Sequence, residues 1–332
     1  MAAENRERPW YREGASWRNP MLVPKQVTWW RLVFKYRGSE LPRTKGRIIG
    51  VALVALVVTV LEERHDWHPN LTPLPFTLVG IALGIFLGFR NNASYDRWWE
   101  GRKLWGALVN TTRSFARQAL TLVGPRASGA EDAQVVALRR EIVLRIVAFV
   151  HALRMSLRDV NDVAELARFL PAEEVERLKS ETNRPYAITQ GTAERLRAAY
   201  DRGWIHDVHL PVLEGSMTAL TDIQGACERI KSTPIPFSYT TLIHRITAGY
   251  CYALPFGLVD SVGILTPAVC VIVAYAFFGL DVVGDELEMP FGNDPNDLPL
   301  DAISRTIEVN LRQRIGERDL PPPLQPVDEI LS

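Results

Sequence analysis

Four uncharged segments, arranged as two close pairs, constrain this chain more than any other feature of its sequence. Two are fourteen residues long, at 48–61 and 246–259, and two are longer, with twenty-one residues at 69–89 and twenty at 261–280. A helix needs about 20 apolar residues to cross the hydrocarbon core of a bilayer. The longer segments reach that length alone, and the shorter ones reach it by including polar flanks. The pattern therefore predicts an integral membrane protein with four transmembrane helices.

Charges beside these segments predict how the chain is oriented. Seven lysines and arginines but one acid, Glu40, lie between residues 25 and 47. Segments rich in Lys and Arg next to a transmembrane helix stay on the cytoplasmic side. The short connections at 62–68 and at Asp260 are then external. Both termini and the long middle of the chain are expected to be cytoplasmic.

Composition excludes several classes of protein. The 38 basic and 38 acidic side chains cancel, so no global field attracts nucleic acid. The cysteines Cys227, Cys251 and Cys270 are far apart and form no CxxC pair, which argues against a disulfide framework and a zinc site. The motifs GxxxxGK[ST], GxSxG and HExxH are absent from the sequence. We expect no cofactor and no nucleic-acid partner.

The patterns divide the chain into six regions. The middle region is helical by pattern, because apolar residues recur at helical spacing from Val136 to Leu153. The expected regions are a mobile N-terminal extension (1–20), an interfacial segment with transmembrane helices near 48–63 and 71–95 (21–96), a cytoplasmic helical region (97–232), the last two transmembrane helices (233–281), a cytoplasmic acidic loop with a C-terminal helix (282–317) and a flexible Pro-rich tail (318–332).

Two stripes run along the second uncharged segment. One consists of glycines, Gly80, Gly84 and Gly88, and the other of large apolar residues, Ile81, Ile85 and Phe89. Positions four apart drift by about 40° around a helix, so each stripe keeps to one face. The glycines let another helix approach closely. The apolar stripe has two interpretations, namely ordinary core or lipid contact, or stacked apolar rings around a shared axis that gate ions by losing their water.

Several motifs, taken in order, resemble the bestrophin family in its bacterial branch. They are GFRNNASYDRWWEGRKLWG (88–106), TPIPFSYTTLIHR (233–245), LPFGL (254–258) and GDELEMPFGNDPNDLPLD (284–301), and WWRLVFKYRGS (29–39) is similar to the family's N-terminal stretch. The resemblance runs from about residue 21 to 317. It implies an all-α homopentameric ion channel in the bacterial inner membrane, with four crossings per subunit and one pore on the fivefold axis. The implied partners are further copies of the chain, membrane lipid and monovalent ions.

The resemblance also implies roles for particular residues. The narrow neck of the pore falls on Ile81, Ile85 and Phe89, which are the apolar stripe already identified from its spacing. A second constriction, at the cytoplasmic exit, falls on Ile235. The interpretation of the stripe as stacked rings around an axis is therefore favoured over core or lipid contact.

The polar residues that follow the neck are expected to leave the bilayer on the same helix. Charges are costly in lipid but acceptable beside a water-filled cavity. A wetted vestibule wall is expected of Arg90, Asn91, Asn92 and Ser94. Helix packing is expected of Gly80, Gly84 and Gly88, of Trp98 and Trp99, and of Arg97 as an ion-paired residue.

A loop after PFG departs from the family pattern. Eukaryotic bestrophins hold calcium there with an acidic run, but this chain has NDPND, with Asn293 in place of a carboxylate and Pro295 stiffening the loop. Calcium takes six to eight oxygen ligands. We expect a structural loop without a metal, in which Asp294 and Asp297 are weak candidate ligands.

Ion selectivity stays open at this stage. The family is best known for anion channels, chiefly for chloride, but its bacterial members include cation-selective channels. Arg90 favours anions, whereas the acids at 281, 285, 286 and 288 favour cations such as sodium. A more distant alternative is a membrane-bound enzyme acting on lipid, for which NNASYD (91–96) offers polar groups without a partner motif. A secondary transporter would need internal repeats, and the four segments show no convincing symmetry.

Overall fold

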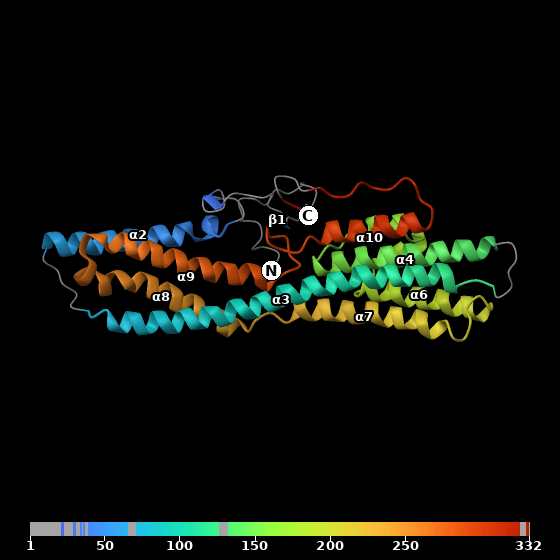
Figure 1. The fold of residues 1–332 in the computed structure, drawn as a ribbon, viewed down its shortest axis with the longest axis horizontal. Helices are drawn as coiled ribbons and strands as arrows, with labels where there is room; N and C mark the ends of the chain where they lie inside the picture. Colours follow the sequence, from blue (N-terminus) through green and yellow to red (C-terminus); the bar gives the residue numbers. More distant parts are fainter. Residues whose placement is uncertain are drawn as a thin grey trace.

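Long helices arranged in two bundles form an elongated molecule (Figure 1). The computed structural model describes residues 21–22, 29–30, 34, 36, 39–65, 71–125, 132–325 and 330–331. The long helices are α2 (Leu41–His65), α3 (Leu74–Leu122), α4 (Ala133–Leu157), α6 (Arg184–Asp201), α7 (Leu210–Ser232), α8 (Phe237–Val262), α9 (Thr266–Glu288) and α10 (Leu300–Arg314). Shorter elements are η2 (Ala164–Arg168), α5 (Ala172–Leu178) and η3 (Gly263–Leu265). The prediction of an all-α membrane-type fold is confirmed, apart from one short strand pair described below.

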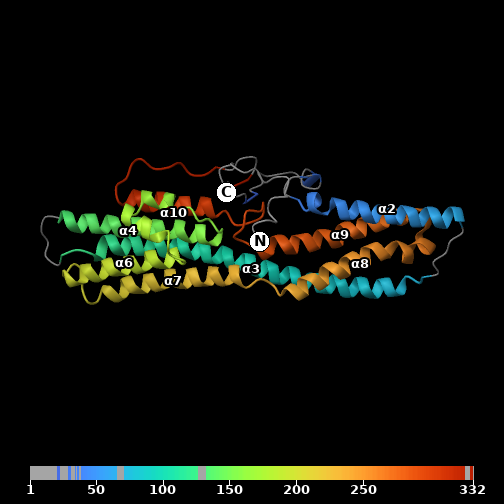
Figure 2. The ribbon, with the colours of Figure 1, turned by 180° about the vertical axis from the view of Figure 1, so that it is seen from behind.

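The first bundle consists of α2, α8, α9 and the first half of α3, and we call it the apolar bundle. Three stretches are long and apolar enough to cross a membrane, namely Leu41–His65, Leu74–Leu122 and Phe237–Glu288. The third stretch folds back at η3, where Gly263 adopts a φ of +55° that favours glycine. Its two halves, α8 and α9, lie side by side in both views (Figures 1 and 2). Four membrane crossings per subunit stay a prediction.

The second bundle consists of α4, α6, α7, α10 and the second half of α3, and we call it the polar bundle. Its interior is a continuous apolar core that includes Trp105 and Phe115 of α3 and Phe149 of α4. The apolar bundle has a smaller interior, in which Val51, Leu254 and neighbouring residues pack together. Each bundle therefore has its own core.

A single uninterrupted helix, α3, runs through both bundles. Its 49 residues span about 74 Å at 1.5 Å per residue, more than twice the roughly 30 Å of a bilayer core. Its buried positions extend from Leu83 to Ala119, and all fall within one sector about 100° wide. The helix therefore keeps one face inward over both bundles. The boundary expected near 96 is not a break in the chain's secondary structure.

The two ends of the described chain meet. Met21–Leu22 (β1) pairs antiparallel with Ile330–Leu331 (β2), while residues 318–325 form no helix or strand. The predicted mobile extension at 1–20 lies outside the described residues. Flexibility of the tail at 318–332 stays a prediction, although part of it is paired with the start of the described chain.

Candidate functional site

The apolar stripe lies on the outside of the subunit. Ile81, Ile85 and Phe89 are 58%, 52% and 63% exposed, and the buried Leu83 and Leu87 face the opposite way. The helix therefore turns its opposite face into the apolar bundle and leaves the stripe open. Packing in the core of its own subunit is excluded for the stripe. Lipid or further copies of the chain remain as its possible surroundings.

The glycine stripe packs within the subunit at one position only. A Cβ at Gly80 would lie 2.6 Å from Tyr250 Oη of α8, so glycine is needed for that approach. At Gly84 and Gly88 a Cβ would meet no described atom within 4 Å. These two glycines keep the open face of α3 smooth beside Ile85 and Phe89.

Arg90, directly after Phe89, occupies the interior of the apolar bundle. Its guanidinium has no exposed surface and donates to Asp281 of α9, at 2.9 Å to Oδ1 and 3.2 Å to the carbonyl oxygen. It also pairs with Asp285 one turn further along α9. Asp281 in turn contacts His244 Nδ1 of α8 at 2.7 Å and Arg47 Nη1 of α2 at 3.5 Å. One charge cluster, centred on the buried Arg90 and Asp281, therefore joins α2, α3, α8 and α9 behind the apolar stripe.

The predicted vestibule wall is corrected by this arrangement. Arg90 and Ser94 are fully buried, and Asn91 is half-buried with its Oδ1 beside Gly284 of α9. Only Asn92, of the four residues, is exposed. The polar residues that follow the apolar segment were expected to face water. In a helix, however, successive residues point in different directions, so some of them face the interior of the subunit. Arg90 is tolerated there because acids from α9 neutralise it.

Arg97 joins the ends of two helices. Its Nε donates to Glu288 O at 3.0 Å, and its two terminal nitrogens donate to Thr233 O and Ile230 O, each at 2.6 Å. The last carbonyls of a helix lack partners within it and carry partial negative charge. The ion pair predicted for Arg97 is therefore replaced by hydrogen bonds to main-chain carbonyls at the C-terminal ends of α9 and α7.

The two tryptophans have different positions. Trp98 is half-buried, and its Nε1 donates to Asn296 O at 3.0 Å, which holds the loop after α9 against α3. Trp99 is 46% exposed, and its ring stacks on Tyr95 at 6.4 Å between centroids. Trp98 therefore packs within the subunit, whereas Trp99 lies on the open face of α3.

The predicted exit constriction lies at the junction of the two bundles. Ile235, in the connection from α7 to α8, is half-exposed, and its N–H donates to Glu288 Oε1 at 2.9 Å. The carbonyl of the same glutamate accepts from Arg97. Glu288 thus fixes Ile235 relative to α3.

Carboxylates in the loop after PFG are engaged in internal contacts. Asp294 pairs with Arg43 Nη2 at 3.0 Å. Asp297 is buried, its Oδ2 accepts the N–H of Asp294 at 2.6 Å, and burial raises its pKa to about 8. Among the described residues, one group of three side chains brings potential metal ligands together, namely His244, Asp281 and Asp285. Arg90 already supplies a positive charge next to Asp281.

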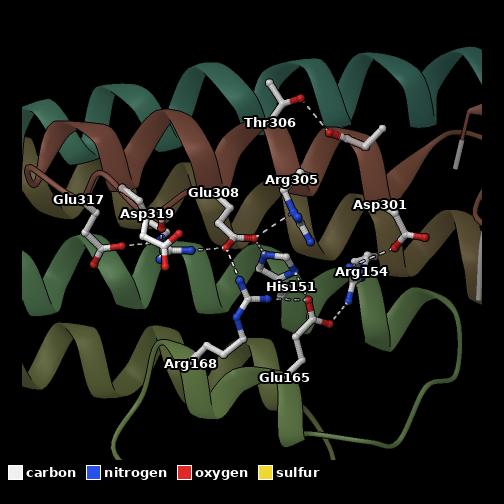
Figure 3. A network of polar contacts seen from close by, with 12 residues as sticks. His151, Arg154, Glu165, Arg168, Asp301, Arg305, Thr306, Glu308, Glu317 and Asp319 are labelled. Carbon is white, nitrogen blue, oxygen red and sulfur yellow. Dashed lines mark hydrogen bonds and ion pairs between the residues drawn. The ribbon is translucent and has the colours of Figure 1, made fainter. Parts of the chain in front are cut away.

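Within the polar bundle, a second charge network fastens α10 to α4 and η2 (Figure 3). The ring nitrogens of His151 in α4 lie 3.2 Å from Glu165 Oε1 and from Glu308 Oε2. Burial disfavours the charge of Glu308, but His151, Arg312 and Arg168 outweigh it and lower its pKa to about 2. No sequence pattern indicated this network, because its members come from three separate elements.

Comparisons with known proteins agree with the fold and the motifs. The family described as bacterial/fungal bestrophin proteins matches residues 21–313. A relative from Ralstonia nicotianae, named a voltage-dependent anion channel-forming protein, is 42% identical over 90% of this chain and 96% of its own length. The Escherichia coli protein YneE, named in the same way, is 36% identical over 92% of this chain and 98% of its own length.

Solved structures give the same answer. The crystal structure of a bacterial bestrophin homologue from Klebsiella pneumoniae has a TM-score of 0.75 and 34% identity. The match covers 82% of this chain and 99% of that one. With the long apolar helices, the continuous α3 and the matching motifs in place, this chain belongs to the bacterial and fungal bestrophin family.

Proposed function

We propose that this chain forms a homopentameric anion channel, chiefly for chloride, in the inner membrane of a bacterium. The names of its relatives as anion channel-forming proteins support the activity. The observation that carries the pore assignment is the exposure of Ile81, Ile85 and Phe89 on the open face of an unbroken helix. Five copies around an axis would turn this stripe into three stacked apolar rings.

The neck controls the passage of ions by holding or losing its water. An apolar constriction gates ions when it loses its water, because an ion cannot then keep its hydration shell. α2, α3, α8 and α9 cross the membrane in this proposal, with both termini and the polar bundle on the cytoplasmic side. Ile235 forms the exit constriction below the neck.

The cation-selective alternative receives less support from the acids that suggested it. Asp281 and Glu286 are buried, and Asp281 is neutralised by Arg90. Glu286 pairs with Arg43. These carboxylates hold helices together and do not offer a ring of free negative charge.

The test measures current through the purified protein in planar bilayers. In asymmetric sodium chloride, a reversal potential near the chloride equilibrium potential supports an anion channel, and one near the sodium equilibrium potential supports the cation alternative. Replacing Ile81, Ile85 and Phe89 by alanine together widens the neck and keeps it wet, so we expect the open current to rise several-fold, by roughly 2 to 10 times.

A matched control removes equally exposed apolar side chains elsewhere. Leu53→Ala with Leu56→Ala on α2 changes residues that are 58% and 52% exposed but lie away from the stripe. These changes should leave the current unaltered. Equal currents from the parent and the triple variant would contradict the neck assignment.

A further inference from the structure

Selectivity between anions and cations must come from charges outside the neck. Ile81, Ile85 and Phe89 carry no charge, and Arg90 is buried and paired with Asp281. An apolar constriction does not distinguish chloride from a cation of similar size, whereas charges near the pore do. Free charges on a surface continuous with the neck are therefore the relevant ones.

The open face of α3 continues beyond the neck without changing direction. The buried sector stays within about 100° from Leu83 to Ala119, so the opposite sector stays open over the same length. At 100° per residue, Lys103, Arg113 and Arg117 fall within about 40° of the direction of Ile81. They lie about 33, 48 and 54 Å further along the axis.

These three cations are exposed and unneutralised. Lys103, Arg113 and Arg117 are all exposed, and none of them forms an ion pair with a carboxylate in the described part of the chain. The acids on this half of α3 are fewer. Asp96 is exposed, points between Ile85 and Phe89 and lies close to the neck, so the open face carries one free acid against these three cations. Glu100 is paired with Arg229 at 2.6 Å.

We infer that Lys103, Arg113 and Arg117 line the wide part of the same conduit and determine its preference for anions by concentrating them below the neck. The inference rests on the proposed channel function. Where Ile81 faces a shared axis, the same face of a helix without a break brings these three residues toward that axis. Five subunits would then contribute fifteen positive charges to one water-filled space, a field that raises the local concentration of anions.

The decisive variable is ionic strength. The Debye length is about 30 Å at 0.01 M salt and about 3 Å at 1 M, so a field from the conduit wall reaches permeating ions only in dilute salt. The experiment records single-channel chloride current of the full chain at about 10 mM and about 1 M KCl. The variant is Lys103→Gln with Arg113→Gln and Arg117→Gln, three changes at exposed positions.

We expect the variant to carry about tenfold less chloride current than the parent at 10 mM, and to differ by less than about twofold at 1 M. The ratio of chloride to potassium permeability should fall with the current at low salt. The charge-conserving variant, Lys103→Arg with Arg113→Lys and Arg117→Lys, should retain the parent current.

A control removes the same number of charges from a different surface. Arg177 in α5, Lys179 directly after it and Arg197 in α6 are exposed, and Lys179 and Arg197 are paired with Glu176 and Asp201. These helices pack against η2, α4 and α7. Changing these three to glutamine should leave the current at 10 mM unaltered. A loss equal to that of the α3 variant would overturn the inference, because net charge alone would then suffice.

Two other results would overturn it. One is an unchanged current in the α3 variant at 10 mM, and the other is the same loss at 10 mM and at 1 M, which would indicate a structural effect. Either result leaves the channel proposal standing, since the parent conducts. If the parent protein passes no current, the proposed function fails and this inference fails with it.

Discussion

Arg90 is the residue on which the geometry behind the stripe most depends. A charge without exposed surface is stable only with close counter-charges and hydrogen bonds, and Asp281 and Asp285 supply them from α9. His244 and Arg47 complete the cluster. Because Arg90 follows Phe89 directly, the cluster also fixes the rotation of α3 and therefore which residues are left open.

Replacing Arg90 by alanine leaves the buried carboxylate of Asp281 without its main counter-charge. We expect the free energy of unfolding to fall by about 3 to 5 kcal/mol, as when one partner of a buried ion pair is removed. Thermal unfolding in detergent measures the change. The control is Arg102→Ala, an exposed arginine on the same helix, expected to alter stability by less than about 0.5 kcal/mol. Equal melting temperatures for the two variants would refute the structural role of the cluster.

At the scale of the helices, close packing inside the apolar bundle depends on glycine at particular points. Gly257 of α8 faces Phe76 near the start of α3, and a Cβ there would overlap the phenylalanine ring. Gly249, on the same helix, would meet no described atom within 4 Å. Two glycines with the same backbone conformation thus have opposite surroundings.

Gly257→Ala should push α3 away from α8 and destabilise the protein by about 1 to 3 kcal/mol, the usual range for overpacking. Gly249→Ala is the matched control, and it should be neutral or stabilising by up to about 1 kcal/mol because alanine favours a helix. Unfolding of both variants in the same detergent measures the difference. A Gly257 variant as stable as the control would show that the helices do not approach as described.

At the scale of the whole molecule, the proposed pore gives the apolar stripe a function only in an assembly. One subunit offers a single exposed stripe, and a pore needs several around one axis. We expect the purified protein in detergent to have five times the 37.4 kDa mass of one chain. Light scattering coupled to size-exclusion chromatography, with the detergent subtracted, measures this mass. A particle of one chain mass would contradict both the pentamer and the pore.

The sequence determined the class of protein and the period of its helices. Hydropathy and helical spacing are local properties of a chain. They were enough to identify the uncharged segments long enough for a bilayer, their basic flanks and the stripe at 81, 85 and 89. The family motifs added an expected role for each position. The exposure of Ile81, Ile85 and Phe89 agrees with the face that their spacing defined.

Only the tertiary structure decided which polar residues face inward. Arg90 and Ser94 were expected beside water and are buried, and Arg97 was expected to pair with an acid and instead meets the carbonyl ends of α7 and α9. The partners of Arg90 and Arg97 lie more than 130 residues away in the chain, so no local pattern specifies them. A charge is stabilised by whatever surrounds it in space, and that depends on how the separate helices pack.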